Sequence, residues 1–284
     1  MIQGDKNMVK YEDLPQLNPE EQTPASKKQA HVSESGAGNA EKIKKLFGCC
    51  FEISKFEEGD CIPIGSEGMF CPTGEMINII GDFESFEQFL SETSKLADEY
   101  DLAEIKQWLG SKGADIDEKL FAVLRAFTEN FQKKYPDNPQ RGEVRRKILN
   151  SRENKEIKLS DIFGENGAEC AEIAALVQAY LQKEGISSTY FSGHVLWRKS
   201  DEYSDMHTFI IIRQDGKVYI YDPANPTSIA SETIPSVFTA EANFDEEMAK
   251  KQNRFVTAKN IFDKKEVFYG VSDCTSVKEE KHII

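Results

Sequence analysis

A cysteine, a histidine and an aspartate that could act together chemically stand at Cys170, His207 and Asp222. A thiol is a useful nucleophile only as the thiolate, and the unpaired N–H groups at the first turn of a helix stabilise that anion. A histidine beside the sulfur can take up and return a proton, and a carboxylate can fix the tautomer of that histidine. These residue types therefore point to acyl transfer through a thioester.

Cys170 is expected at the start of a helix. Apolar residues recur at helical spacing from this point and the run stops at Gly185, the members being Ile173, Ala174, Val177, Tyr180 and Leu181. The small Gly167-Ala168 pair leaves room for a substrate, and the N–H of Cys170 is a candidate oxyanion donor, with Asn166 as a weaker second candidate. Taken alone, Cys170 fits a buried core position better, because free cysteine commonly packs as a small apolar residue.

A predicted β-hairpin brings the other two residues together. The segments MHTFIIIR and VYIYDP flank Asp215-Gly216, and Asp-Gly between apolar runs is a strong hairpin signal. A loop of two or four residues pairs Arg213 with Val218, Phe209 with Asp222 and His207 with Ala224. His207 and Asp222 then share one face, roughly 7 to 8 Å apart between backbones. A three-residue loop would put them on opposite faces, and a purely structural His–Asp hydrogen bond is the alternative explanation.

The order and spacing of these segments resemble the transglutaminase-like superfamily, which includes transglutaminases, peptide N-glycanases, arylamine N-acetyltransferases and many bacterial cysteine proteases and deamidases. The resemblance covers about residues 157–227 and rests on GAECAEIAALVQAYLQKEGI, HTFIII and VYIYDPANP. It implies a nucleophile at Cys170, a general base and acid at His207, and an orienting carboxylate at Asp222. It also implies a papain-like or transglutaminase-like core.

The function expected from these residues is acyl transfer on a protein or peptide amide through a thioester, without a cofactor. Water as the acceptor would make the protein a protease or a glutamine deamidase, and an amine would make it a transglutaminase. The competing hypothesis is a catalytically silent binding module that presents the same cleft to a partner. Labelling of the six cysteines with iodoacetamide separates the two, because a catalytic Cys170 reacts fastest.

The composition limits the partners. A formal net charge of -14 repels phosphate backbones and anionic lipids, so nucleic acid and membranes are not expected partners. No apolar leader or membrane-spanning run is present, which predicts a cytoplasmic protein. The polar N-terminal segment and the ending VKEEKHII weakly resemble bacterial effectors, so delivery into a host cell is the alternative. The oligomeric state is left open.

The predicted fold class is α+β, with a nucleophile helix packed on an antiparallel sheet and a helical region before it. Four parts are expected: a disordered tail over 1–40, a mainly helical region over 41–150, the catalytic core over 151–272 and a charged tail over 273–284. Within the second part, KIKKLFGCCFEI indicates a short helix or a helix-to-strand transition. Beyond Pro226 the only further strand predicted is 266–270.

Other residues that could carry chemistry are given no role. His194 is a rival base without a carboxylate beside it, and the basic stretch 141–147 fits the solvated face of a helix. No metal site is expected, because the four N-terminal cysteines lack the spacing of zinc ligands. Three aromatic residues could line a cleft but are more typical of strands and cores. The four cysteines are Cys49, Cys50, Cys61 and Cys71, and the three aromatic residues are Trp197, Tyr219 and Tyr221.

Overall fold

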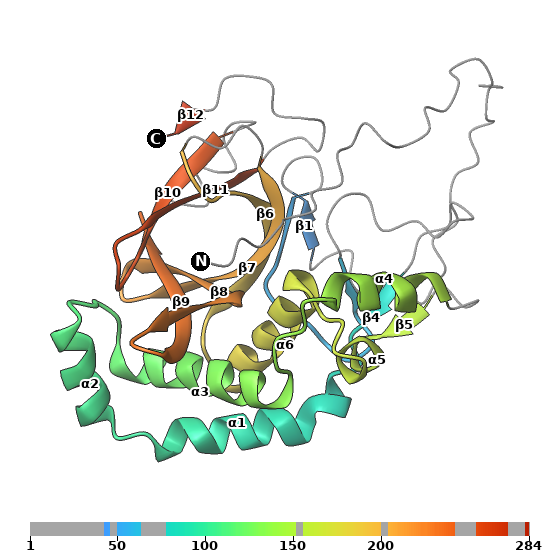
Figure 1. Cartoon of the computed structure of the whole chain (residues 1–284), viewed down its shortest axis with the longest axis horizontal. Coiled ribbons are helices and arrows are strands. Elements are labelled where there is room, and N and C mark those ends of the chain that lie inside the picture. The colour runs from blue at the N-terminus through green and yellow to red at the C-terminus, as the bar shows by residue number, and fades with distance from the viewer. Residues whose placement is uncertain are drawn as a thin grey trace, which may run out of the picture. The chain divides into compact units, whose positions relative to one another are not determined.

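Antiparallel strands close into a barrel, and helices cover one side of it (Figure 1). The computed structural model describes residues 43–45, 50–63, 78–151, 156–199, 204–241, 254–271 and 282–283. All of them belong to one compact unit, residues 35–284. The predicted tail over 1–40 and most of the one over 273–284 lie outside the described residues, and the proposed division into four parts stays a prediction.

Six strands form the barrel: β6 (Ser188–Leu196), β7 (Asp205–Gln214), β8 (Lys217–Ile229), β9 (Glu232–Ala240), β10 (Arg254–Asn260) and β11 (Glu266–Val271). Their order is β6-β11-β10-β9-β8-β7, and β7 pairs with β6, so the ring is closed. Closure gives β6 and β7, the two ends of this order, a barrel strand on each side. Short strands lengthen the sheet, with β2 (Phe51–Ile53) on β6, β1 (Ile43–Lys45) on β2, and β12 (His282–Ile283) parallel to β10.

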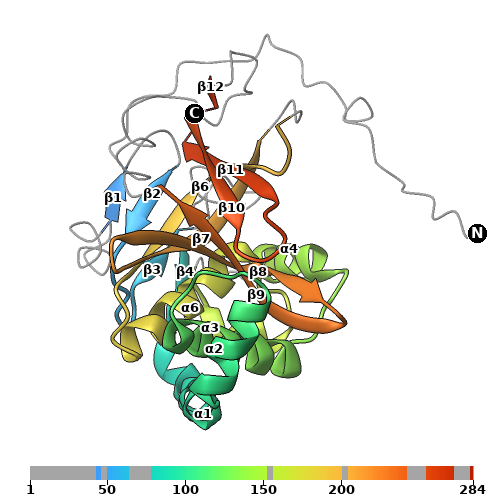
Figure 2. The same ribbon diagram turned by 90° about the vertical axis from the view of Figure 1, so that its left-hand side faces the viewer.

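The helices lie on the side of the barrel formed by β6 to β9 (Figure 2). They are η3 (Phe83–Phe86), α1 (Glu87–Glu99), α2 (Leu102–Ser111), α3 (Glu118–Lys134), α4 (Arg141–Ser151), α5 (Leu159–Gly164) and α6 (Cys170–Lys183). A second small sheet joins β3 (Cys61–Ile62), β4 (Asn78–Ile80) and β5 (Glu156–Lys158). None of the helices in the described ranges combines the length and apolar character that crossing a membrane requires.

The strand residues alternate between two apolar cores, as the period of a β-strand requires. Tyr190, Ile210 and Tyr221 pack with residues of α3 and α6, in the core between barrel and helices. The residues one position away, including Phe191, Phe209 and Ile220, form a separate core with the other strands. Because the first face meets the helices, the second face points into the barrel.

The predicted α+β class is confirmed, and α6 packs on β6, β7 and β8. The helices expected between residues 82 and 150 are present, and Asp101 and Asp117 cap two of them by accepting backbone N–H groups. The expected strand near 266–270 is present as β11. The helix expected within residues 42–53 is wrong where the structure describes them, because Ile43–Lys45 form β1, whereas the strand of the alternative helix-to-strand transition is present as β2. The sequence prediction also missed β9 and β10, which complete the barrel.

Candidate active site

Cys170 is the first residue of α6, where the sequence places it. The helix ends at Lys183, and Gly185 follows with a positive φ of 69°, a conformation that glycine adopts without strain. The Cys170 side chain is half-buried, whereas Ile173, Ala174 and Val177 on the same helix are fully buried. The nucleophile candidate therefore lies at an end of the helix where N–H groups lack helical partners.

The hairpin has the predicted register. Asp215 and Gly216 have φ of 50° and 75°, as a two-residue type I′ turn requires. The recorded pairs run from Gln214–Lys217 through Arg213–Val218 to Ile210–Tyr221. Beyond that ladder, His207 Nε2 and Asp222 Oδ2 lie 2.9 Å apart, within a hydrogen bond. The two residues share one face, as predicted.

Asp222 is fully buried and has a second partner. The side-chain amide of Asn225 donates to both carboxylate oxygens, at 3.3 Å to Oδ1 and 3.1 Å to Oδ2. Asn225 can turn back because the pairing of β8 with β9 shifts register between Asp222 and Thr227. Such a bulge redirects side chains next to it. Asn225 was not predicted as a site residue, although it belongs to the segment VYIYDPANP on which the family resemblance rests.

The charge state of His207 follows from its neighbours. Burial lowers the pKa of His207, but the negative charge and hydrogen bond of Asp222, followed by a hydrogen bond with the Cys170 side chain, raise it to about 10. Because Nε2 is bonded to Asp222, Nδ1 is the ring nitrogen left to face the sulfur. At neutral pH the ring is then an imidazolium, which places a positive charge beside the Cys170 sulfur.

Aromatic side chains frame the histidine. The Trp197 ring meets the His207 ring edge-on, with centroids 5.5 Å apart, and the indole N–H donates to Asp205 Oδ2. On the barrel side, Phe209 lies at a centroid distance of 6.3 Å. Trp197 thus lies beside the candidate site, whereas Tyr219 and Tyr221 are buried in the core toward the helices.

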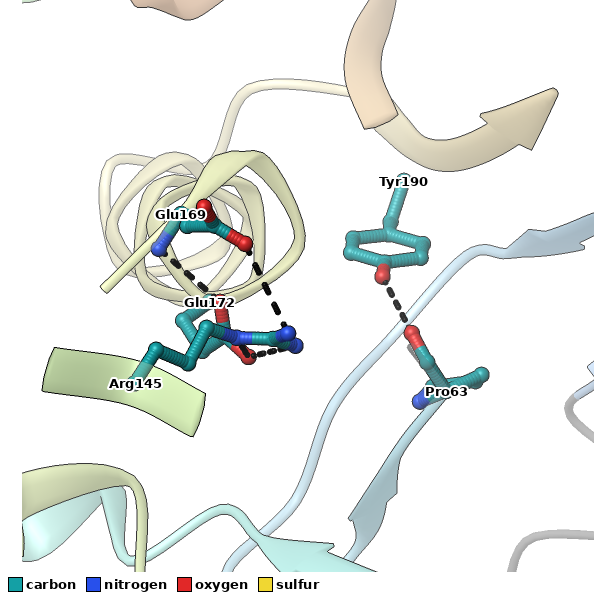
Figure 3. A network of polar contacts seen from close by, with 5 residues as sticks. All are labelled: Pro63, Arg145, Glu169, Glu172 and Tyr190. Atoms are coloured by element: carbon teal, nitrogen blue, oxygen red, sulfur yellow. Dashed lines mark hydrogen bonds and ion pairs between the residues drawn. The ribbon is translucent and has the colours of Figure 1, made fainter. Parts of the chain in front are cut away.

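A buried ion pair holds the first turn of α6 (Figure 3). Arg145 of α4 donates through Nε and Nη2 to Glu172 Oε1, at 2.9 and 2.6 Å, and its Nη1 lies 3.5 Å from Glu169 Oε2. The other carboxylate oxygen of Glu172 accepts the Glu169 N–H at 3.0 Å, one half of a capping box. The prediction that the basic stretch 141–147 is a solvated face is therefore wrong at Arg145, which α6 covers.

Tyr190 of β6 lies apart from this ion pair and links β6 to the segment around Pro63 (Figure 3). Its hydroxyl donates to the Pro63 carbonyl at 2.8 Å. Burial, followed by the charge of Cys170, raises the pKa of Tyr190 well above its ordinary value. The hydroxyl therefore stays protonated and does not act as a base.

The remaining candidates lie elsewhere. Asn166 donates its amide to the Pro136 carbonyl at 2.9 Å, so this contact occupies the side chain that was the weaker oxyanion candidate. His194 pairs with Met206 and therefore points to the face opposite His207, where its Nδ1 meets Ser204 Oγ at 3.0 Å. Cys50 and Cys61 are present as reduced thiols. Cys49 and Cys71 lie outside the described residues, so the expectation about the four cysteines stays a prediction.

One comparison with known proteins gives a match. A family model described as N-acetyltransferase matches residues 149–267, a range that contains Cys170, His207 and Asp222 and covers less than half of the chain. No curated protein matches. No solved structure matches either.

This match corrects the assignment made from the sequence. The resemblance to the transglutaminase-like superfamily is wrong as a family assignment, because the family model that matches is described as N-acetyltransferase and no transglutaminase-like model matches. The protease, deamidase and transglutaminase activities lose their support with it. The chain is similar over residues 149–267 to proteins that transfer an acetyl group to nitrogen.

Proposed function

We propose that this protein is a cysteine-dependent N-acetyltransferase. Cys170 would take an acetyl group from a thioester donor such as acetyl-CoA and pass it to a small amine. The single observation that carries the proposal is the chain of contacts from Cys170 through His207 to Asp222, inside the segment that matches the N-acetyltransferase family. Acyl transfer through a thioester is the chemistry that such a set performs.

In the first half-reaction, the Cys170 thiolate attacks the carbonyl carbon of the acetyl donor. The carbon–sulfur bond of the donor breaks, and the His207 imidazolium gives its Nδ1 proton to the departing thiolate. The products are acetyl-Cys170, the free donor thiol and a neutral His207. The buried Asp222 keeps Nε2–H of the ring in place, so the lone pair formed on Nδ1 points at the thioester.

In the second half-reaction, the amine attacks the acetyl carbon of acetyl-Cys170. Neutral His207 removes the proton of the attacking nitrogen, and the bond from carbon to the Cys170 sulfur breaks. The amide leaves, and the thiolate and imidazolium are restored. The N–H groups of the first turn of α6 are the candidate donors to the oxyanion in both halves.

The acceptor that fits best is a small aromatic amine. The ring of Trp197, which is partly exposed, lies next to the His207 ring at a centroid distance of 5.5 Å. An aromatic amine is neutral at pH 7 and so needs no base before its attack. A planar ring gains about 0.5 to 1.5 kcal/mol from packing on an aromatic side chain such as that of Trp197.

The test follows the acetyl group. Wild type and Cys170→Ala are incubated with acetyl-CoA or p-nitrophenyl acetate, first without an acceptor and then with p-aminobenzoate. Intact-mass spectrometry should find one acetyl group on wild type, mapped to Cys170, that disappears when the amine is added as N-acetylated product forms. Equal labelling of the two proteins would refute the proposal and leave the binding-module hypothesis.

A further inference from the structure

Glu172 is an unusual residue for the position that it occupies. It lies in the first turn of α6 with a fully buried side chain, between Ala171 and Ile173, which are also buried. An ionised carboxylate that is removed from water is costly unless it is paired and hydrogen-bonded. Arg145 supplies the pairing from a different helix, so α4 and the start of α6 are held together by charge.

The packing around this ion pair is close. A Cβ atom at Gly167 would lie 3.1 Å from the Arg145 backbone nitrogen, and one at Gly142 would lie 2.8 Å from Glu169 Oε1. The absence of side chains at these two positions lets α4 approach the turn that leads into Cys170. The guanidinium consequently reaches both glutamates of that turn.

From this geometry we propose that Arg145 is a positioning residue for Cys170. Through Glu172 it sets the first turn of α6, which aims the sulfur at His207, and its charge offsets the two glutamates that flank the nucleophile. This inference rests on the proposed function for its effect on acetyl transfer. Its effect on the reactivity of the thiol does not depend on which acyl donor the protein uses.

The charged groups that face Cys170 explain why the offset is needed. Glu169 caps the helix that Cys170 begins, and Glu172 lies in its first turn. Arg145 comes from α4 and His207 from β7, with Asp222 of β8 behind the imidazole. Tyr190 of β6 is uncharged, as its raised pKa requires. Without Arg145, two carboxylates would lie within one turn of the Cys170 sulfur, and among the groups named here His207 alone would oppose them, so negative charge on the sulfur would be less favourable.

The experiment measures the alkylation of Cys170 by iodoacetamide as a function of pH, read by peptide mass spectrometry in the full chain. The variants are Arg145→Met, Arg145→Lys and the double variant Arg145→Met with Glu172→Gln. Arg146→Met is the matched control, because Arg146 is exposed on the same helix. Thermal unfolding and p-nitrophenyl acetate turnover are followed in parallel.

Arg145→Met should move the midpoint of the alkylation profile up by about one pH unit and slow alkylation at neutral pH about tenfold. Arg145→Lys should keep the midpoint near that of wild type, because the charge remains, but lower turnover, because an ammonium lacks the planar fork of Arg145. The double variant should bring the midpoint back toward wild type while turnover stays low. The Arg146→Met control should leave both unchanged.

An alkylation profile of Arg145→Met that coincides with wild type would overturn the proposal, even if that variant melts earlier, since lost packing alone lowers stability. If Arg145→Met does not fold, the double variant, which carries neither charge, provides the test. An alkylation midpoint of the double variant that lies a full pH unit above that of wild type would then overturn the proposal. A shifted profile together with no acetylation of wild type would uphold the positioning role and refute the N-acetyltransferase proposal.

Discussion

Replacing Asp222 by asparagine should lower the pKa of His207, so that the ring loses its positive charge at neutral pH. Asp222 and Cys170 raise the pKa of His207 from 6.5 to about 10 against burial, which lowers it. A rise of this size corresponds to at most about 5 kcal/mol in favour of the imidazolium, at about 1.4 kcal/mol per pH unit. The asparagine side chain can still accept a hydrogen bond but carries no charge. The pKa of His207 should therefore fall by roughly three units, which leaves a neutral ring at neutral pH.

Acetylation of Cys170 in Asp222→Asn should then slow on the order of 10⁴-fold, the scale on which the loss of an orienting carboxylate acts. The rate is measured as the single-turnover release of p-nitrophenol. The His207 pKa is measured by NMR of the labelled ring, with Cys170→Ala in both proteins to remove the thiol. Asp215→Asn in the exposed turn is the matched control. A His207 that titrates above pH 9 in Asp222→Asn, or acetylation within threefold of wild type, would refute the electrostatic reasoning.

The same shift makes a prediction about stability. The folded-state pKa of His207 lies above its unfolded value, so the imidazolium contributes its full stabilisation below about pH 6.5. That contribution is lost as the pH rises through the interval from 6.5 to about 10. Urea unfolding of wild type should therefore show a free energy that declines across this interval, whereas the curve of Asp222→Asn should be flatter there. Parallel curves would contradict the assignment.

Three further substitutions test other parts of the site. Cys170→Ser should abolish acetyl transfer but change the unfolding free energy by less than about 1 kcal/mol, because the side chain is only half-buried; retained transfer would exclude the thiol as nucleophile. Asn225→Ala should slow transfer about tenfold, because Asp222 loses a charge-assisted donor; an unchanged rate would mean that His207 alone orients the carboxylate. Gly193→Ala should cost about 2 kcal/mol in urea unfolding, since the added Cβ would lie 2.8 Å from the Gly270 carbonyl oxygen; wild-type stability would show that β6 and β11 can separate.

Local signals in the sequence determined the parts of the site that local physics controls. The helix over Cys170–Lys183 follows from apolar spacing and a glycine stop, both of which act within one segment. The approach of His207 to Asp222 follows from the Asp215-Gly216 turn, because positive φ at two central residues sets the strand register. The residues that carry the proposed chemistry were therefore accessible from the sequence, although the family that they resemble was misjudged.

Contacts between distant segments were decided only by the tertiary structure. The barrel closes where β11 pairs with β6, far earlier in the chain, and the intervening strands β9 and β10 carry no distinctive local pattern. Arg145 lies in a stretch of charges that, by itself, is typical of a solvated helix face. Only the packing of α4 on the start of α6 buries its guanidinium against Glu172, because burial is a property of what covers a side chain and not of the side chain itself.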